Sequence, residues 1–461
     1  MDSYQSSSPK SIETYGKRLI DGSLRSVRGI REIPAKSLST AQGLKTKSAF
    51  GFLLERYYYG INPPNDSAPD FPKAKVELKS TPLKRLKNGE FSAKERLVLN
   101  LINYNDEAKR NFSSSTFIKK NSQIMLIAYL HEKERAVVDY IVKIAELVAL
   151  RKLSRADQII IEQDWKKIVK KIKDGHADEL SEGDTLYLGA CTKAANSKVF
   201  RSAPGDIQAK PRAFSFKAGF MTTLMRGLMD AESAVKNVSE LEDNDFESLI
   251  EKRFERFLGL TVAEIKNQVG KDLNSDAKGF FAQLARRMMG VRKSTVEEFE
   301  KADVIMKTVR LGKNGMPRES ISFPYFSYMD IVKERWDEDE KGAGAPSLLK
   351  QELEKKFFFV VLQCGDDPND IQSMWLKKVM FWNMPISDLD GDVRKVWRET
   401  VRRIKVGKAD QLPKSTENRV SHVRPHARDS HDTIPTPRNG MQVKKCFWLN
   451  QSYIKDQVSN S

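Results

Sequence analysis

The sequence predicts an α/β protein built from two tandem copies of one fold, each a mixed sheet flanked by helices. Three observations lead to this prediction. Short apolar runs with the length of buried strands, such as residues 124–130 (IMLIAYL), alternate with segments of helical period. Similar motifs occur in the same order in both halves. An acidic stretch separates the halves, which gives a domain over 1–225, a linker over 226–245 and a domain over 246–461.

The elements of the first half follow from hydrophobic period and turn residues. Roughly the first 40 residues are rich in Ser and Lys and are expected to form a loosely packed arm. A hairpin turn is expected at the Lys-Asn-Gly of 87–89. The other expected elements are a helix over 47–60 closed by Gly60, strands over 76–83 and 124–130, a long helix over 136–172, and strands over 185–188 and 213–216.

The repeat is visible in four pairs of segments. FGFLLERYYYG at 50–60 matches FFAQLARRMMG at 280–290, and DFPKAKVELK at 70–79 matches EFEKADVIMK at 298–307. Two lysines precede the apolar runs at 124 and 357, and AFSFKAGFM at 213–221 resembles CFWLNQSYI at 446–454. Any one match could arise by chance, but four in the same order indicate a duplicated fold.

Composition limits the class of protein. The 461 residues carry 79 Lys and Arg against 62 Asp and Glu, a net charge of +17, which favours a polyanionic partner such as nucleic acid. The alternative is a protein that lysines merely keep soluble. The three cysteines, Cys191, Cys364 and Cys446, are too few and too far apart for a disulfide scaffold or a CxxC zinc site. With no membrane-spanning run and no signal-peptide core, we expect a cytoplasmic protein.

The residues most suggestive of chemistry lie around the strand predicted at 76–83. Glu77 and Lys79 point to one face of this strand, and Asp70 lies just before it. Asp70 and Glu77, with the Leu78 carbonyl oxygen, are hard ligands for Mg²⁺, and Lys79 can orient a water and offset charge on a phosphate. Glu55 on the preceding helix can reach the same region. The alternative is a half-exposed strand edge with solvated side chains.

The second copy lacks most of these groups. Its aligned residues are Ala285 for Glu55, Glu298 for Asp70, Ile305 for Glu77 and Lys307 for Lys79. Because isoleucine cannot bind a metal, we expect one active site per chain, in the first copy.

These motifs resemble the MutH family of Mg²⁺-dependent endonucleases, which have a PD-(D/E)xK restriction-endonuclease-like fold. The resemblance rests on KSAFGFLLERYYYG, PDF and VELKSTP, and on LSEGDTLYLGACTKAANS followed by RAFSFKAGFM, and it spans most of 47–221. The two-copy arrangement is similar to the type II restriction endonucleases that cut at 5′-GATC-3′. In those enzymes the first MutH-like domain is catalytic, and the second is a degenerate copy that binds DNA and promotes cleavage.

The resemblance also implies roles for individual residues. The implied catalytic set is Glu55, Asp70, Glu77 and Lys79, with a further lysine before the central strand. That lysine is Lys120 or Lys119, and the sequence does not decide between them. The implied DNA contacts are Lys193, Arg212, Lys217 and Arg424, although neither copy has the complete Arg-Pro-Lys of the family's base-reading loop.

The expected function is Mg²⁺-dependent hydrolysis of both DNA strands at GATC, leaving 5′-phosphate ends. One active site per chain then requires two chains on one target, or sequential nicking, and the host requires a companion GATC methyltransferase. The alternatives are a MutH-like mismatch-repair endonuclease that only nicks GATC, and a DNA-binding protein without catalysis.

Overall fold

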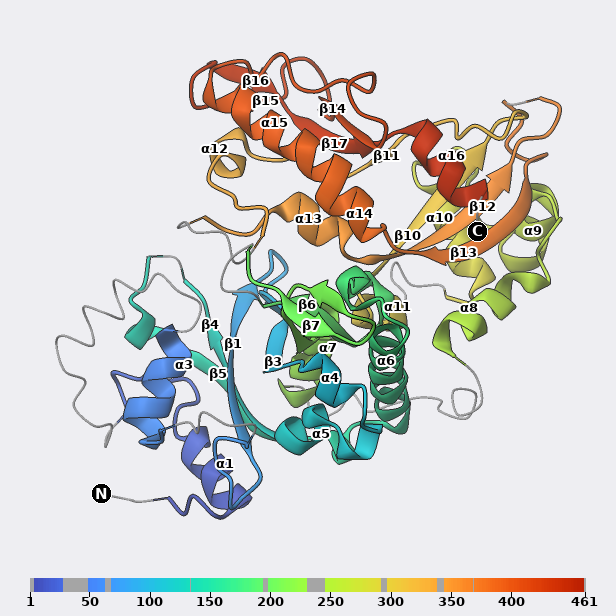
Figure 1. The fold of residues 1–461 in the computed structure, drawn as a ribbon. Coiled ribbons are helices and arrows are strands. Elements are labelled where there is room, and N and C mark those ends of the chain that lie inside the picture. Colours follow the sequence, from blue (N-terminus) through green and yellow to red (C-terminus); the bar gives the residue numbers. More distant parts are fainter. Residues whose placement is uncertain are drawn as a thin grey trace.

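The computed structural model describes residues 4–27, 49–62, 68–132, 134–193, 198–229, 245–291, 297–337, 344–367 and 369–459. The two halves of the chain form two stacked bodies, with the first half at the bottom of Figure 1 and most of the second half above it. Among the described residues, no helix is long and apolar enough to cross a membrane. The three cysteines are buried and unbridged.

The chain start packs against the body of the first half, so the expectation of a loose arm is wrong for residues 4–27. Helix α1 (Pro9–Lys17) is followed by a series of turns, and the side chains of Ile12, Leu19 and Leu24 are fully buried. The Tyr15 ring stacks on that of Tyr58, with 4.6 Å between their centroids. Buried apolar and aromatic side chains outweigh the polar composition of this segment. Residues 28–48 lie outside the described part.

The main sheet of the first half has the strand order β2-β1-β4-β5. Its strands are β1 (Glu77–Arg85), β2 (Phe91–Ala93), β4 (Gln123–Leu130) and β5 (Val142–Ala149). β1 runs parallel to β4, with Glu77 opposite Ile124, while β2 and β5 are antiparallel to their neighbours. The strands predicted at 76–83 and 124–130 and the turn at 87–89 are therefore present.

The long helix predicted over 136–172 is wrong, because that segment contains strand β5 and then helix α6 (Arg155–Lys173). The charged residues of β5 led to the prediction of a helix, but in the structure they form ion pairs with residues of the N-terminal segment 4–27. Lys143 lies 2.6 Å from Asp21, and Glu146 lies 2.9 Å from Lys17. The helix begins only at its N-cap residue, Ser154.

The helix predicted over 47–60 is present from residue 49 onwards. It consists of α3 (Ala49–Leu53) and a π-helical turn, η1 (Leu54–Tyr59), and it ends at Gly60, whose φ of 65° is left-handed. The π-helical turn contains Glu55.

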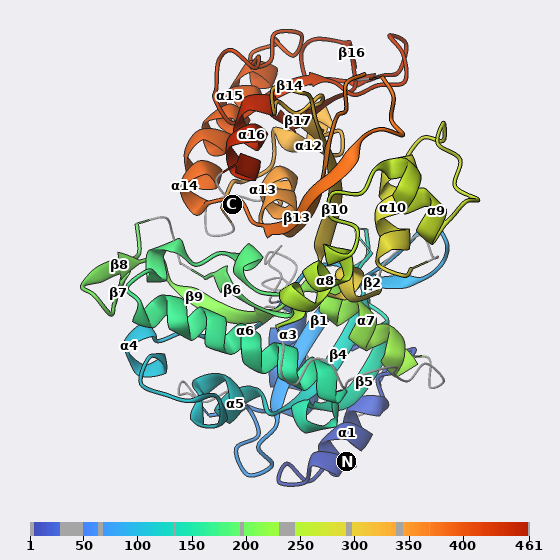
Figure 2. The same ribbon diagram turned by 90° about the vertical axis from the view of Figure 1, so that its right-hand side faces the viewer.

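A second sheet of the first half has the order β3-β9-β6, and α6 lies along it (Figure 2). The strand predicted at 213–216 is β9, whereas the one predicted at 185–188 begins only at Leu188. The remaining elements of this half are β3 (Leu97–Leu101), α4 (Tyr104–Glu107), α5 (Thr116–Asn121), β6 (Leu188–Thr192), β7 (Arg201–Ala203), β8 (Ile207–Ala209), β9 (Arg212–Phe216), α7 (Ala218–Met229), and 3₁₀ turns at Phe112–Ser114, Val137–Asp139, Leu150–Lys152, Ala177–Glu179 and Glu182–Asp184.

The second half starts with three helices, α8 (Phe246–Glu255), α9 (Val262–Val269) and α10 (Phe280–Met288). Its other elements are α11 (Glu297–Lys301), β10 (Val304–Leu311), β11 (Ile321–Ser322), α12 (Tyr328–Ile331), α13 (Leu348–Leu353), β12 (Lys356–Gln363), β13 (Trp375–Trp382), α14 (Ile386–Asp388), a π-helical turn η7 (Leu389–Val393), α15 (Arg394–Lys405), β14 (Ser421–Pro425), β15 (Thr433–Pro435), β16 (Met441–Val443), β17 (Lys445–Leu449) and α16 (Gln451–Ser459).

Strand order recurs between the halves. In the second half β10 is parallel to β12, which is antiparallel to β13, as β1, β4 and β5 are in the first. The order β11-β17-β14 likewise corresponds to β3-β9-β6, and each half has a separate two-stranded ribbon.

The boundary between the halves is partly helical and partly outside the described residues. Residues 226–229 of the predicted linker are the end of α7, and residues 230–244 are not described. One hydrophobic cluster extends across the boundary and includes Phe220 and Met225 of α7 together with Phe254, Phe299 and Phe358 of the second half. The two halves therefore share buried apolar surface.

Candidate active site

Asp70, Glu77 and Lys79 converge at the start of β1. The chain reverses between Phe71 and Val76, which form an antiparallel bridge, and Lys75 adopts a left-handed φ of 54° there. This reversal returns Asp70 to the strand, where its Oδ2 accepts a hydrogen bond of 2.9 Å from the Leu78 N–H. The Asp70 N–H in turn donates to Glu77 Oε2 at 3.2 Å.

Two lysines face the Glu77 carboxylate, which is only 2 % exposed. Lys79 Nζ lies 2.8 Å from Glu77 Oε1 and 3.5 Å from the carbonyl oxygen of Leu99 on β3. Lys120 Nζ, at the end of α5, lies 3.7 Å from the same Oε1. Lys119 is exposed, and neighbouring helical residues point in different directions. The geometry thus brings Lys120 to the cluster.

The carboxyl groups of Glu55 and Asp70 have raised pKa values. Burial, followed by the nearby Asp70 charge, raises the pKa of Glu55 to about 7. Burial and the Glu77 charge likewise raise the pKa of Asp70 to about 6, although the hydrogen bond from Leu78 opposes the shift. Three carboxyl groups, of which that of Glu77 is buried, lie in one region, and a cation bound there would offset their negative charge.

The donor set suits a divalent hard cation. Among the described residues, no group of three or more His, Cys, Asp and Glu side chains is arranged to hold a metal. Asp70 and Glu77, with the Leu78 carbonyl oxygen and water, would be the ligands, a donor set with few carboxylates that suits a small divalent cation. The residues present fit the metal.

The second half repeats the lysine of this arrangement but not its carboxylates. Lys307 Nζ lies 3.3 Å from the carbonyl oxygen of Ser322 on β11, as Lys79 does from Leu99 on β3. Ile305 stands where Glu77 stands in β1, and Ala285 is fully buried within α10. Glu298 is exposed. Burial lowers the pKa of the Lys307 ammonium.

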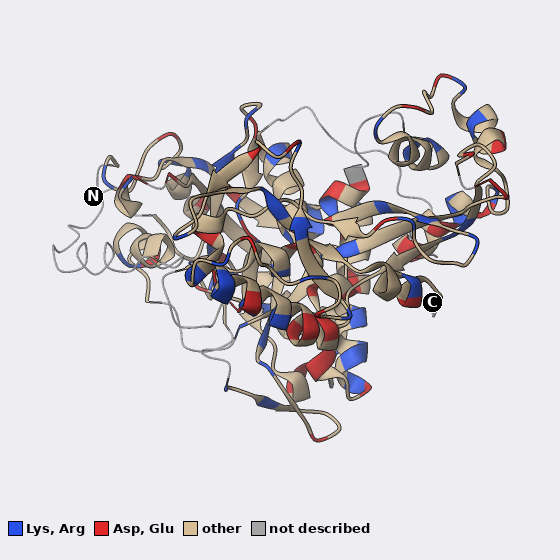
Figure 3. Ribbon diagram, turned by 90° about the horizontal axis from the view of Figure 1, so that it is seen from above, with Lys and Arg blue, Asp and Glu red and all other residues tan. Residues whose placement is uncertain are grey.

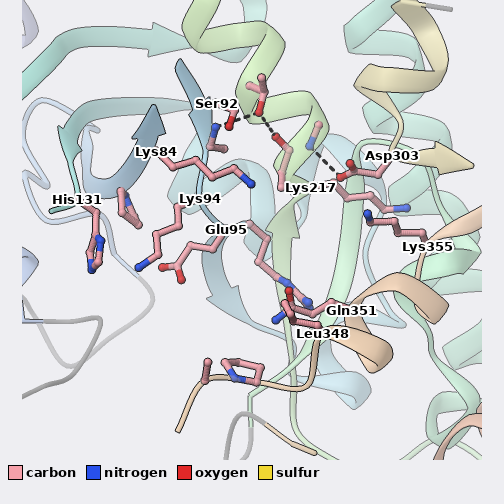
Figure 4. Close-up of a pocket in the computed structure, with 18 of the residues that line it drawn as sticks. Lys84, Ser92, Lys94, Glu95, His131, Lys217, Asp303, Leu348, Gln351 and Lys355 are labelled. Atoms are coloured by element: carbon pink, nitrogen blue, oxygen red, sulfur yellow. Dashed lines mark hydrogen bonds between the residues drawn. The ribbon is translucent and has the colours of Figure 1, made fainter. Parts of the chain in front are cut away.

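A large cavity lies elsewhere, between the two halves, with a volume of about 1280 Å³. Figure 4 shows Lys84, Lys94 and His131 of the first half on one side of it, and Gln351 and Lys355 of the second half on another. Lys84 is seven residues along β1 from Glu77, a separation of roughly 20 Å. The lining of the cavity does not include Asp70, Glu77, Lys79 or Lys120, so the cavity is distinct from the candidate active site.

The four residues expected to contact DNA fall into two classes. Lys193, at the end of β6, is exposed, as is Arg424, whose guanidinium lies 3.8 Å from the centre of the Trp448 ring. Arg212 and Lys217 are each 4 % exposed. Arg212 donates to the Ala190 carbonyl oxygen at 3.1 Å, and Lys217 donates to that of Thr185. In the free protein these two side chains are internal hydrogen-bond donors.

Basic residues do not gather on a single element. Seen from above in Figure 3, Lys and Arg occur throughout both halves and are interspersed with Asp and Glu. The net positive charge is therefore distributed widely over the molecule.

Sequence reasoning missed the backbone group beside Lys79. The Leu99 carbonyl oxygen and the adjacent Asn100 come from β3, about twenty residues after the strand that carries Lys79. Nothing in the local sequence of β3 marks it, because the contact depends on how the second sheet packs against β1.

Comparison with known proteins agrees with this geometry. A profile of the DNA mismatch repair enzyme MutH matches residues 59–164, which include Asp70, Glu77, Lys79 and Lys120. The type II restriction enzyme Sau3AI of Staphylococcus aureus is 34 % identical over 466 aligned positions, which cover 90 % of this chain and 93 % of that enzyme. The chain belongs to the MutH-like restriction endonucleases.

A third similarity covers a smaller part of this endonuclease. The DNA mismatch repair protein MutH of Buchnera aphidicola subsp. Baizongia pistaciae is 24 % identical over 160 residues, which cover 34 % of this chain and 70 % of that protein. The chain is thus a site-specific deoxyribonuclease that acts on DNA, and the MutH match implies a PD-(D/E)xK-like fold.

Proposed function

We propose that this endonuclease hydrolyses both strands of DNA at 5′-GATC-3′ with Mg²⁺ and leaves 5′-phosphate ends. The observation that carries the proposal is the convergence of Asp70, Glu77, Lys79 and Lys120 within the segment matched by the MutH profile. The GATC target and the 5′ ends follow from the resemblance of residues 47–221 to the MutH family.

Each residue of the cluster has a separate task in this proposal. Asp70 and Glu77 bind the metal, which when bound polarises the phosphodiester and lowers the pKa of a water. Lys79 orients the attacking water, and its ammonium offsets the charge that grows on the phosphate oxygens. Lys120 adds a second positive charge beside Glu77. Glu55 holds a proton near the site, since the pKa of its carboxyl is raised to about 7.

We also propose that the chain consists of two copies of one fold, bounded as 1–225 and 246–461, of which only the first cleaves. Matched contacts support this. The hydroxyl of Tyr104 in α4 donates to the Lys210 carbonyl before β9, and that of Tyr328 in α12 donates to the Val443 carbonyl before β17. Lys75 and Asp303, two residues before Glu77 and Ile305, both adopt a left-handed φ of 54°.

With one active site per chain, double-strand cleavage at one target requires a second chain or a second binding event. We propose that two chains meet on the target DNA and that Lys193 and Arg424, the exposed pair, contact it. A host that contains the enzyme requires a GATC methyltransferase for its own protection.

The decisive experiment is digestion of an unmethylated plasmid of known sequence with Mg²⁺, followed by mapping of the product ends. We expect linear fragments that begin with a 5′-phosphate at GATC, and no products from Glu77→Ala. Nicked circles that never become linear would favour the mismatch-repair activity. Cleavage at other sequences would refute the GATC assignment, and unchanged cleavage by Glu77→Ala would refute the metal site.

A further inference from the structure

A chain of buried and part-buried hydrogen bonds leads from α6 to the helix that carries Lys120. Glu107, at the end of α4, is fully buried and accepts from the indole N–H of Trp165 at 2.8 Å. The other oxygen of Glu107 accepts from the backbone N–H of Thr116 at 3.2 Å and from its hydroxyl at 2.5 Å. Thr116 is the first residue of α5, so Glu107 fixes the start of that helix.

The chain continues from Thr116 to the end of α5. The Asn100 amide on β3 donates to the Thr116 hydroxyl at 3.2 Å, and its Oδ1 accepts from the Asn121 amide at 2.7 Å. Asn121 also donates to the Phe117 carbonyl at 3.0 Å. From Asn121 to Asn100, Thr116 and Glu107, each side chain donates to the next one along this path, so these bonds polarise one another.

Asn121 and Asn100 adjoin the two lysines of the active site. Asn121 follows Lys120 directly, and Asn100 follows Leu99, whose carbonyl oxygen faces Lys79. The Asn100–Asn121 hydrogen bond therefore joins the end of α5 to the strand beside Lys79.

The second half shows that the fold itself does not need these polar groups. Aligned through the matched tyrosines, lysines and helix ends, Ile331 replaces Glu107, Phe323 replaces Asn100 and Leu353 replaces Asn121. All three replacements are buried and belong to one hydrophobic cluster. The half that lacks the carboxylates thus packs apolar side chains where the catalytic half buries polar ones.

Burial of the polar set has a cost that apolar packing avoids. The Oδ1 atom of Asn121 is buried without a hydrogen-bond partner among the described residues, and an unsatisfied buried acceptor destabilises the folded state. Polar groups retained at such a cost, at the positions next to both lysines, point to a role other than stability.

We propose that Glu107, Asn100 and Asn121 are positioning residues that hold Lys120 against Glu77. This inference rests on the proposed role of Lys120 in cleavage. Without the Asn100–Asn121 bond, the end of α5 is free to rotate or shift, and the ammonium of Lys120 no longer stays 3.7 Å from Glu77 Oε1.

The test compares single-turnover cleavage at saturating DNA with DNA affinity and melting temperature. Asn121→Leu introduces the residue found at the matched position of the second half. If this variant does not fold, Asn100→Ala removes the same hydrogen bond by deleting its acceptor, and Asn100 is only half-buried. We expect each to slow cleavage about 10–100-fold, with DNA affinity unchanged and no fall in melting temperature for Asn121→Leu. Asn105→Ala is the matched control, because Asn105 is exposed and donates to the Ser202 carbonyl instead.

A double-mutant cycle separates positioning from a merely structural effect. In a Lys120→Ala background, Asn121→Leu is expected to cause no further loss, since it acts through that lysine. An equal loss in both backgrounds, or wild-type cleavage by a folded Asn121→Leu protein, would overturn the inference while leaving the role of Lys120 intact. Wild-type cleavage by Lys120→Ala would instead show that the proposed function of Lys120 is wrong.

Discussion

The Nζ atom of Lys79 lies 2.8 Å from Oε1 of Glu77 on the same face of β1, and 3.5 Å from the carbonyl oxygen of Leu99 on the neighbouring sheet. Because residues two apart on a strand point to the same face, the two side chains lie side by side. The second sheet packs against this face at Leu99 of β3. The ammonium is held between an anionic ligand and a neutral acceptor. In the proposed mechanism, the Lys79 ammonium turns toward a phosphate when a metal binds the Glu77 carboxylate.

Lys79 and Lys307 occupy matched positions, so they provide a direct test of one active site per chain. We expect Lys79→Met to lower the single-turnover cleavage rate by about 10²–10³-fold, because a group that offsets charge on the phosphate is lost. Lys307→Met is expected to cleave at the wild-type rate, since Ile305 leaves no carboxylate beside it. Equal losses in the two variants would show that both halves take part in catalysis.

The pH dependence of stability follows from the raised pKa values of Glu55 and Asp70. Their ordinary values are 4.5 and 3.8, and in the folded protein they are about 7 and about 6. At a pH between the ordinary and the raised pKa of each group, the native state binds more protons than the unfolded state. The metal-free protein therefore loses stability as the pH rises from about 4 to about 7. Mg²⁺ favours the ionised carboxylates. We therefore expect the rise in melting temperature on addition of Mg²⁺ to be larger at about pH 8 than at about pH 5.5.

Glu55→Gln isolates the contribution of that carboxyl group. The variant is expected to show a flatter decline in stability with pH when Mg²⁺ is absent, measured by thermal unfolding. A decline identical to that of the wild type would mean that Glu55 does not titrate in this window.

Lys193 and Arg212 differ in exposure, and we expect their substitutions to differ accordingly. Lys193→Ala removes an exposed charge at the end of β6 and is expected to weaken DNA binding about tenfold, measured as a Kd at fixed salt. Arg212→Met removes a donor to Ala190 and is expected to lower the melting temperature instead. A loss of DNA affinity by a fully stable Arg212→Met protein would establish Arg212 as a DNA contact.

Asp164 accepts hydrogen bonds from the backbone where β6 begins, and we expect it to contribute strongly to the stability of the first half. Its carboxylate is 1 % exposed and accepts from the backbone N–H groups of Leu186, Tyr187 and Leu188 at 2.9, 2.6 and 2.9 Å. Asp164→Ala would leave three buried donors without an acceptor, so we expect a loss of about 3 kcal/mol or more in the free energy of unfolding. Asp174→Ala, an exposed position at the end of the same helix, is the control and should change it by less than about 0.5 kcal/mol.

Local sequence determined most of the first half's active site. The arrangement of Asp70, Glu77 and Lys79 depends on one turn and one strand. Both can be recognised from about ten consecutive residues of the sequence. The strand at 124–130 and the helix that ends at Gly60 are likewise set by local apolar period. Alignment of the two halves by sequence also identified Ala285 and Ile305 as the residues opposite Glu55 and Glu77.

Tertiary structure decided what local patterns leave open. Lys120 rather than Lys119 reaches Glu77, because the packing of α5 on β3 fixes which face of the helix turns inward. The segment 142–149 is a strand, because β4 and α1 supply partners for its backbone and its charges. Arg212 is internal because the Ala190 carbonyl lies across the sheet from it. Each of these depends on contacts between residues distant in the chain, which no local period encodes.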